Sequence, residues 1–565
     1  MTTIMKTLVP SLLLLLVPAA AFADLTPDQK RSDFVDLAGL YDKQYAPYEW
    51  KRLLFGFDAL NIAPWLDRVA KTTNDLDFYE LCIEYVASLN DTHDGFSLPS
   101  DFSANLGMNL DIYDGKVLIE TINRTLLPQS KYPFQVGDEL VSVDGKDVND
   151  LLNDFVKYAH QGNPRSARRI AASRIVSRPQ SIMPHAAELG DNATLVIRGQ
   201  DASTQTYTIP WNKTGTPLGV GIVPTPKSQS QEVAGIASDE PVPDYLQLWR
   251  DVQYSGVSGD TGVLNYGSRT PIFALPSNFV QRQGLRTTDF FYSGTYPAGG
   301  ARIGYIRIPT YGSLAASVQQ EFDTEIAYFQ ANTDGLIVDE MRNTGGFLCF
   351  GENIMTRLVP YPFQSIGYEL RATQSRLNSF YSNLQAAKNA QADQWIIDSY
   401  QAWFNDVLSA FKENRGLTGP LPLCADTGQT RYPATDRNGD SIAYTRPVMM
   451  LIDEFSTSTA DSVPAMFQDA RRGPLFGWRT NGAGGTNTTF DSGAYSEGAT
   501  GMTLGLMNRP TAIAVDGFPT TTHIENVGVR PDIEVDYMTK DNLLQRGKPF
   551  VDAFTAAMVN LIQNK

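Results

Sequence analysis

A group of small hydroxyl side chains follows closely after a strongly apolar segment, and it could supply a nucleophile. The apolar segment, residues 448–453, reads Val-Met-Met-Leu-Ile-Asp. The residues with hydroxyl side chains that follow it are Ser456, Thr457, Ser458 and Thr459. The apolar run predicts a buried strand, and Pro464 suits the first turn of a helix, where a missing N–H costs little. Backbone N–H groups at such a strand-to-helix turn can stabilise an oxyanion. The segment therefore suits acyl transfer, although its composition is also typical of helix caps and turns.

A serine hydroxyl needs a base within hydrogen-bond reach, so the histidines are the next candidates. His93 lies in a polar loop, residues 91–95, after a segment predicted to be helical. His523 is two residues before Glu525 and would share a strand face with it. The other histidines, which match no motif and which we interpret as structural, are His160 and His185.

Three segments, in the same order along the chain, resemble motifs of the peptidase S41 superfamily, which contains the C-terminal processing and tricorn-like proteases. Residues 456–472 are similar to its S-A-S-A-S-E and Q-D-x-G-R-A stretch, residues 339–346 to its D-x-R-x-N-x-G-G turn, and residues 525–533 to its G-V-x-P-D element. The resemblance implies that Ser458 is the nucleophile. It also implies an oxyanion hole made by backbone N–H groups of Gly345, Gly346 and Thr459.

One departure from the family pattern bears on the mechanism. In the Ser/Lys branch a lysine of an F-G-K-G loop is the base, but Ala483 occupies that place here, and no lysine lies between Lys412 and Lys540. In the tricorn-like and chlamydial branch the base is an N-terminal histidine that a glutamate of an E-N-x-G-V-x-P-D motif orients. The resemblance to that branch implies that His93 is the base and that Glu525 orients it.

The residues and the resemblance together predict an exported serine endopeptidase that hydrolyses protein substrates through an acyl-enzyme on Ser458. Three alternatives remain. His523 could be the base, a remote lysine could replace His93, or the chain could be an exported peptide- or ligand-binding protein that has lost hydrolysis. No metal or cofactor is expected for this chemistry.

The elements that must position these residues form an α/β multidomain chain. Residues 24–100 are predicted to be a helical region that carries His93, and residues 101–215 a β-rich domain with turn dipeptides at Asp114-Gly115 and Asp144-Gly145. Residues 136–145 resemble a PDZ-like signature, which implies binding of an extended peptide; the alternative is a small β-domain without that role. We expect a linker or insertion at 216–300, with an exposed loop at 224–244. Residues 301–565 should form a ClpP/crotonase-like α/β catalytic core with a helical insertion at 376–415.

Composition limits the remaining possibilities. The 565 residues carry a formal net charge of −16 without a Lys/Arg-rich run, which disfavours a nucleic-acid partner. Lys6, a short apolar run and Ala21-Phe22-Ala23 predict a signal peptide at 1–23, cleaved near Ala23, and hence a secreted or periplasmic protein without stable membrane insertion. Three cysteines allow one disulfide, whose pairing stays open among Cys82, Cys349 and Cys424. The oligomeric state also stays open, a homo-oligomer included.

Overall fold

The computed structural model describes residues 24–218, 243–254, 256–257, 264–424 and 428–564. The predicted signal peptide and nearly all of the predicted 224–244 loop lie outside these residues. Among the described residues, no helix combines the length and the apolar character needed to cross a membrane. The chain is of the mixed α/β class, as predicted.

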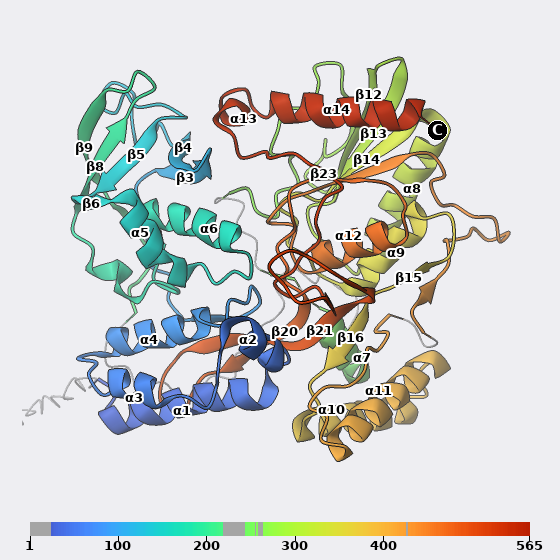
Figure 1. Ribbon diagram of the computed structural model, residues 1–565, viewed down its shortest axis with the longest axis horizontal. Helices are drawn as coiled ribbons and strands as arrows, with labels where there is room; N and C mark the ends of the chain where they lie inside the picture. Colours follow the sequence, from blue (N-terminus) through green and yellow to red (C-terminus); the bar gives the residue numbers. More distant parts are fainter. Residues whose placement is uncertain (1–23, 219–242, 255, 258–263, 425–427, 565) are drawn as a thin grey trace, which may run out of the picture.

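The N-terminal region is helical and ends at the loop that carries His93 (Figure 1). Its helices are α1 (Pro27–Gln44), α2 (Tyr48–Phe55), α3 (Ala63–Val69) and α4 (Asp75–Ala87). Thr26 begins α1 with a reciprocal capping box, and the Asn74 side chain accepts the Asp77 N–H at the start of α4. Asn90, with a positive φ of 51°, turns the chain after α4 toward β1 (Gly95–Ser97).

The next region is a six-stranded sheet in the order β3-β4-β5-β8-β9, with β6 paired to β5. Its strands are β3 (Met108–Tyr113), β4 (Lys116–Ile122), β5 (Glu139–Val143), β6 (Lys146–Asp147), β8 (Asn192–Arg198) and β9 (Thr204–Pro210). Both predicted turn dipeptides join adjacent antiparallel strands, and all four of their residues have positive φ, as the tightest hairpin turns require. Around this sheet lie α5 (Val148–Phe155), η1 (Val156–Tyr158), α6 (Pro164–Val176), η2 (Pro184–Glu188) and a small sheet of β10 (Asn212–Thr214), β2 (Ser103–Asn105) and β7 (Ser177–Pro179).

The core of the C-terminal half is a seven-stranded sheet in the order β11-β12-β13-β14-β18-β19-β23, parallel from β13 onward. Its strands are β11 (Val280–Gln283), β12 (Tyr292–Ala298), β13 (Ala301–Arg307), β14 (Gly335–Asp339), β18 (Val448–Ile452), β19 (Leu475–Gly477) and β23 (Ile533–Glu534). Every residue of β14 and β18 is buried, because helices cover both faces. One face packs on α8 (Ala316–Asn332), α9 (Leu348–Leu358) and α12 (Thr459–Asp469), and the other on α14 (Lys548–Gln563) (Figure 1).

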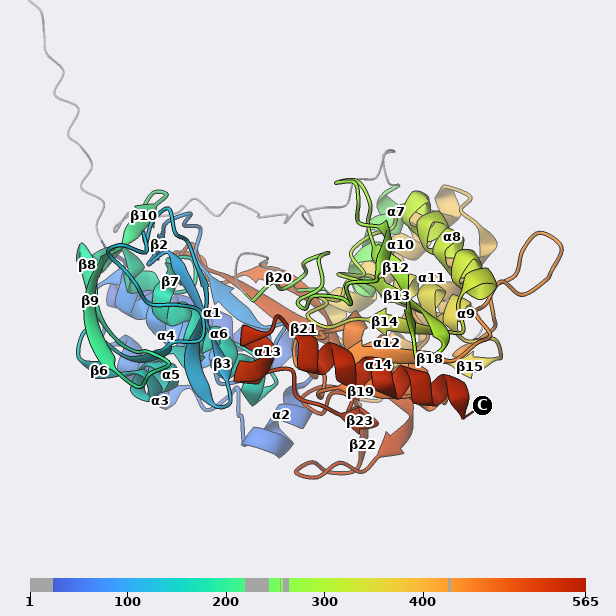
Figure 2. The ribbon, with the colours of Figure 1, turned by 90° about the horizontal axis from the view of Figure 1, so that it is seen from above.

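A third sheet joins the N-terminal helical region to this core. Its centre is the long strand β21 (Ala499–Ile513), which pairs with β1 from the N-terminal region and with β16 (Gly367–Leu370), β20 (Gly485–Asp491) and β22 (Thr521–His523). Figure 2 shows β20 and β21 extending between the two halves of the molecule. The remaining elements are α7 (Asp244–Gln253), the helical pair α10 (Gln374–Asn389) and α11 (Gln394–Lys412), the β15 (Phe363–Gln364) and β17 (Thr430–Arg431) ladder, and α13 (Lys540–Leu544).

Candidate active site

Ser458 stands at the turn between the buried strand β18 and helix α12. Its backbone has φ 65° and ψ −110°, a conformation that is uncommon for a residue other than glycine. The Ser458 N–H donates to Asp461 Oδ2 at 2.7 Å, which holds this conformation from the first turn of the helix. The side chain is fully buried, and its Oγ lies 2.9 Å from His93 Nε2. A strained turn thus presents a serine to an imidazole.

His93 is positioned by its own loop and by β21. Asp91 Oδ1 accepts the His93 backbone N–H at 2.9 Å. On the other side, a side chain at Gly501 of β21 would place its Cβ 2.7 Å from the His93 carbonyl oxygen, so only glycine allows this close approach. The pairing of β1 with β21 therefore brings a residue of the N-terminal region to the end of β18.

The Gly345-Gly346 turn lies against the nucleophile. A Cβ on Gly345 would come within 2.8 Å of Ser458 Cβ, and one on Gly346 would collide with the Tyr311 backbone at 2.2 Å. Thr459 Oγ1 donates to the Gly346 carbonyl at 2.8 Å and ties this turn to the start of α12. The Gly345 N–H donates to Asn343 Oδ1 at 2.8 Å. The three residues predicted for an oxyanion hole thus surround Ser458, with the Gly345 amide bound to Asn343 in this state.

Glu525 lies in a buried ionic cluster next to the His93 loop. Its Oε1 accepts from Lys51 Nζ at 2.5 Å, and its Oε2 accepts the Gly484 N–H at 2.9 Å. Lys51 Nζ also lies 3.9 Å from Asp91 Oδ2. Glu525 is therefore joined to the His93 loop through Lys51 and Asp91. Lys51 is not apparent as a site residue from the sequence, because a lysine in a short amphipathic helix matches no catalytic motif.

Burial sets the proton affinities in this cluster. Burial raises the pKa of Asp91, but the Lys51 and His93 charges outweigh it and leave that pKa below its ordinary value. Burial, reinforced by the Asp91 charge and opposed by Lys51, raises the pKa of Glu525 to about 8. Burial and the Asp91 charge also raise the pKa of Asp94 well above its ordinary range. Asp91 is thus the carboxylate of the three that most readily keeps its negative charge beside His93.

Asp461 links the nucleophile to the segment where the Ser/Lys branch has its lysine. Its carboxylate accepts the Gly482 N–H at 2.8 Å and the Ala483 N–H at 3.0 Å, in addition to that of Ser458. Burial raises the pKa of Asp461 to about 6, opposed by these hydrogen bonds and one from Thr480. In the sequence, Asp461 stands out only as part of a motif. The signal for its role is an acidic residue three positions after the turn serine, which is typical of a capping box.

The other three histidines lie apart from the Ser458 hydroxyl. His523 Nε2 contacts Glu369 Oε2 at 3.1 Å, and its ring packs edge-on to Trp50. His160 is half-buried beside Gly95, and desolvation lowers its pKa to about 4. His185 binds Glu188 at 2.8 Å on the surface. Of the four histidines, His93 is the one whose ring reaches Ser458.

A second ionic cluster connects the six-stranded domain to the same strand ends. Arg169 of α6 donates two hydrogen bonds to Asp111 of β3, at 2.8 and 2.6 Å, and a third to Glu454 at 2.9 Å. Glu454 lies four residues before Ser458. The Arg342 N–H, just before the glycine turn, donates to Asp453 at 2.8 Å. The placement of β3 is therefore coupled to both segments that flank the nucleophile.

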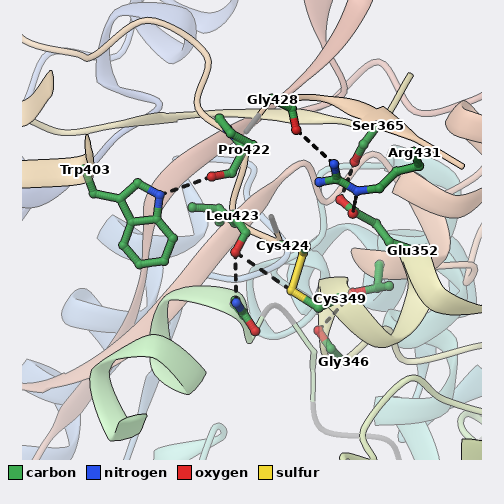
Figure 3. Close-up of a disulfide and its surroundings, with 12 residues drawn as sticks. Gly346, Cys349, Glu352, Ser365, Trp403, Pro422, Leu423, Cys424, Gly428 and Arg431 are labelled. Atoms are coloured by element: carbon green, nitrogen blue, oxygen red, sulfur yellow. Dashed lines mark hydrogen bonds and ion pairs between the residues drawn. A yellow bond between two sulfur atoms is a disulfide. The ribbon is translucent and has the colours of Figure 1, made fainter. Parts of the chain in front are cut away.

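The disulfide pairs Cys349 with Cys424, and Cys82 is a buried free thiol. Cys349 lies three residues after Gly346, in the first turn of α9. Figure 3 shows the bond beside the segment that follows α11, where Pro422 O accepts from Trp403 Nε1 at 3.1 Å. The disulfide thus ties the helical pair α10–α11 to the helix that follows the glycine turn.

Among the described residues, no group of three or more His, Cys, Asp and Glu side chains could hold a metal ion.

Two segments of the chain match models of known families. Residues 302–535 match the model of peptidase family S41, and residues 103–218 match that of a PDZ domain. A protein of Chlamydia pneumoniae is 24% identical over 601 residues, which cover 96% of this chain and 92% of the relative. The chloroplastic C-terminal processing peptidase of Tetradesmus obliquus is 23% identical over 244 residues, which cover 42% of this chain and 37% of the relative.

Solved structures show the same overall fold. The crystal structure of mature CPAF superposes with a TM-score of 0.74 at 22% identity, covering 95% of this chain and 98% of that one. Mature CPAF in complex with lactacystin gives a TM-score of 0.73 at 22% identity, covering 95% and 99%. The S41 and PDZ matches agree with the resemblances predicted from the motifs, and the solved structures agree with the predicted fold.

Proposed function

Because residues 302–535 form a peptidase family S41 domain and residues 103–218 a PDZ domain, we propose that this chain is an exported serine endopeptidase with Ser458 as nucleophile and His93 as general base. The observation that carries the proposal is the 2.9 Å contact between His93 Nε2 and Ser458 Oγ. That distance is within the range for proton transfer from a hydroxyl to an imidazole. The strained backbone of Ser458 supports the same assignment, because strain in folded proteins concentrates at functional sites.

The chemistry follows from this pair. His93 takes the Ser458 proton as Oγ attacks the scissile carbonyl carbon, and the carbonyl oxygen becomes an oxyanion. Backbone N–H groups of the Gly345-Gly346 turn and of Thr459 receive that oxyanion. The imidazolium then protonates the leaving amine, and water, activated by the same imidazole, releases the acyl group from Ser458. Asp91 supplies negative charge for the imidazolium, and Glu525, joined to Asp91 through Lys51, helps to hold the His93 loop. No step of this proposed reaction requires a metal or an organic cofactor.

The PDZ domain supplies the second part of the proposal. Such domains bind an extended peptide as an added strand on a sheet edge, which suits the recognition of protein chains. The Arg169 hydrogen bond from this domain to Glu454 connects it directly to the turn that leads to the nucleophile. We therefore propose protein or peptide substrates.

The test is labelling of the purified protein with a fluorophosphonate probe, comparing wild type with Ser458→Ala and His93→Ala. Loss of labelling in both variants supports the serine-histidine assignment. Labelling that persists in His93→Ala would refute His93 as the base and favour a remote lysine. A folded wild type without labelling would favour the non-catalytic binding protein. His523→Ala is the matched control, because that ring contacts Glu369, and it should keep its labelling.

Export is tested separately. N-terminal sequencing of the protein recovered outside the cytoplasm should begin at Asp24. An intact Met1 would refute the cleavage predicted near Ala23.

A further inference from the structure

Lys51 is a fully buried cation that the proposed mechanism does not use directly. The side chains of Lys51 and of its partner Glu525 are both 0% exposed, and Lys51 Nζ lies 2.5 Å from Glu525 Oε1. The ammonium also donates to the Asn90 carbonyl at 2.8 Å and to Asn526 Oδ1 at 2.7 Å. A buried ammonium is costly unless it is paired and hydrogen-bonded, and this one is surrounded by acceptors.

The acceptors come from the two segments that flank the candidate base. Asn90 and Asp91 belong to the loop that carries His93, whereas Glu525 and Asn526 belong to the segment near the other end of the chain that resembles the E-N-x-G-V-x-P-D motif. Asn526 Nδ2 also donates to the Asn90 carbonyl at 2.8 Å, so the two segments contact each other around the ammonium. Lys51 is therefore the common partner through which these two segments are held together.

The charge of Lys51 has a second consequence. Asp91 and Glu525 are both buried, and two neighbouring buried carboxylates resist simultaneous ionisation. A cation between them allows one to stay ionised, and the lowered pKa of Asp91 agrees with this. Asp91 also accepts the His93 backbone N–H, so its negative charge lies next to the imidazole that must become positive.

We propose that Lys51 is a positioning residue of the active site: it joins Glu525 to Asp91, holds the His93 loop against Ser458, and balances the carboxylate charge that the imidazolium needs. This inference rests on the proposed function. Lys51 itself does not touch the reacting atoms; it acts through the two carboxylates.

Several other titratable groups face this cluster and contribute to its pH response. The hydroxyl of Tyr45, the residue that follows α1, donates to Asp91 Oδ2 at 2.8 Å. Burial, reinforced by the Asp91 charge, raises the pKa of Asp94, whereas desolvation lowers the pKa of His160 to about 4 against the opposing Asp91 charge. These groups are unchanged in a Lys51 variant, so a shift of the pH profile reports the lost ammonium.

The experiment measures the second-order rate of fluorophosphonate labelling of Ser458 between pH 5 and 9. In Lys51→Met we expect the rate at neutral pH to fall at least tenfold, because the His93 loop loses its tie to Glu525. We also expect the acidic limb to move up by half a pH unit or more, because the imidazolium becomes the remaining cation beside Asp91 and forms more readily. A purely structural role would lower the rate without moving that limb.

Lys30 offers a matched control. Its Nζ is also buried, lies 3.3 Å from Asp75 and donates to the Asn74 carbonyl at 2.8 Å, away from the His93 loop. Lys30→Met removes an equivalent buried cation and should leave the limb in place. An equal shift in both variants would overturn the inference.

A second variant keeps the test decisive if Lys51→Met does not fold. Lys51→Met/Glu525→Gln removes both members of the ion pair and leaves no unpaired charge between them. Its acidic limb is compared with that of Glu525→Gln alone. An upward shift supports the role of Lys51, and identical limbs refute it. Absence of labelling in folded wild type would instead refute the serine mechanism itself, so the two failures are distinguishable.

Discussion

Asp461 should control the reactivity of Ser458, although it does not touch the proton that moves. Its carboxylate accepts three backbone amides, those of Ser458, Gly482 and Ala483, at 2.7 to 3.0 Å. Asp461→Asn keeps the shape but replaces one accepting oxygen with an NH₂ group. At least one buried amide then loses its acceptor, and the others lose a charged one.

The expected size follows from the strain that these bonds maintain. A residue other than glycine at φ 65° costs about 1–3 kcal/mol, and the Ser458 N–H bond to Asp461 opposes that cost. If relaxation of the turn removes the same amount from transition-state stabilisation, labelling of Ser458 slows about 5- to 150-fold. The assay is the fluorophosphonate labelling rate, with thermal unfolding as the check on folding.

The pH dependence makes this prediction specific. Burial raises the pKa of Asp461 to about 6, so wild type carries a protonated, amide-like side chain below that pH. The ratio of the wild-type labelling rate to the Asp461→Asn labelling rate should therefore fall toward one between pH 8 and pH 5. Asp469→Asn, at the end of the same helix and paired with Arg509, is the matched control. Labelling within twofold of wild type at pH 8, or a ratio independent of pH, would refute the reasoning.

Three further outcomes are expected. Cys349→Ser/Cys424→Ser removes a disulfide between residues 75 positions apart. The unfolding free energy, measured by urea denaturation, should fall by about 4 kcal/mol on the loop-entropy model, and a change below about 1 kcal/mol would contradict this prediction. Glu525→Gln should flatten the pH dependence of the unfolding free energy. In wild type the folded pKa of about 8 lies above the ordinary 4.5, so the stability that Glu525 contributes is present below pH 4.5 and is lost as pH rises through 8, by roughly 5 kcal/mol in total. An equally steep profile in the variant would count against this. Arg169→Leu removes the hydrogen-bonded partner of buried Asp111 and one of the two arginines that bind Glu454, and should cost about 3–5 kcal/mol in the same urea measurement. Arg198→Leu, at a more exposed pair, should cost under about 1 kcal/mol, and similar losses in the two variants would show that the buried cluster is not special.

Local patterns in the sequence were enough for several elements of the fold. The apolar run at 448–453 predicts the strand before the nucleophile, and β18 occupies Val448–Ile452. The Asp-Gly dipeptides predict two hairpins, because few other residues adopt positive φ at low cost. The helical pattern at 376–415 corresponds to α10 and α11. In each case neighbouring residues alone determine the backbone.

By itself the sequence predicted the family resemblance, the fold class and a strand-to-helix turn at Ser458, although the helix begins at Thr459 and contains Pro464 in its interior. It left open which histidine faces that serine, which cysteines pair, and what lies around the glutamate motif. His93 and Ser458 are 365 positions apart, and Lys51 and Glu525 are 474 apart. The pairing of β1 with β21 and the burial of α2 bring them together. Contacts between such distant residues depend on how whole elements pack, and no local spacing encodes that packing, so the tertiary structure decided the composition of the site.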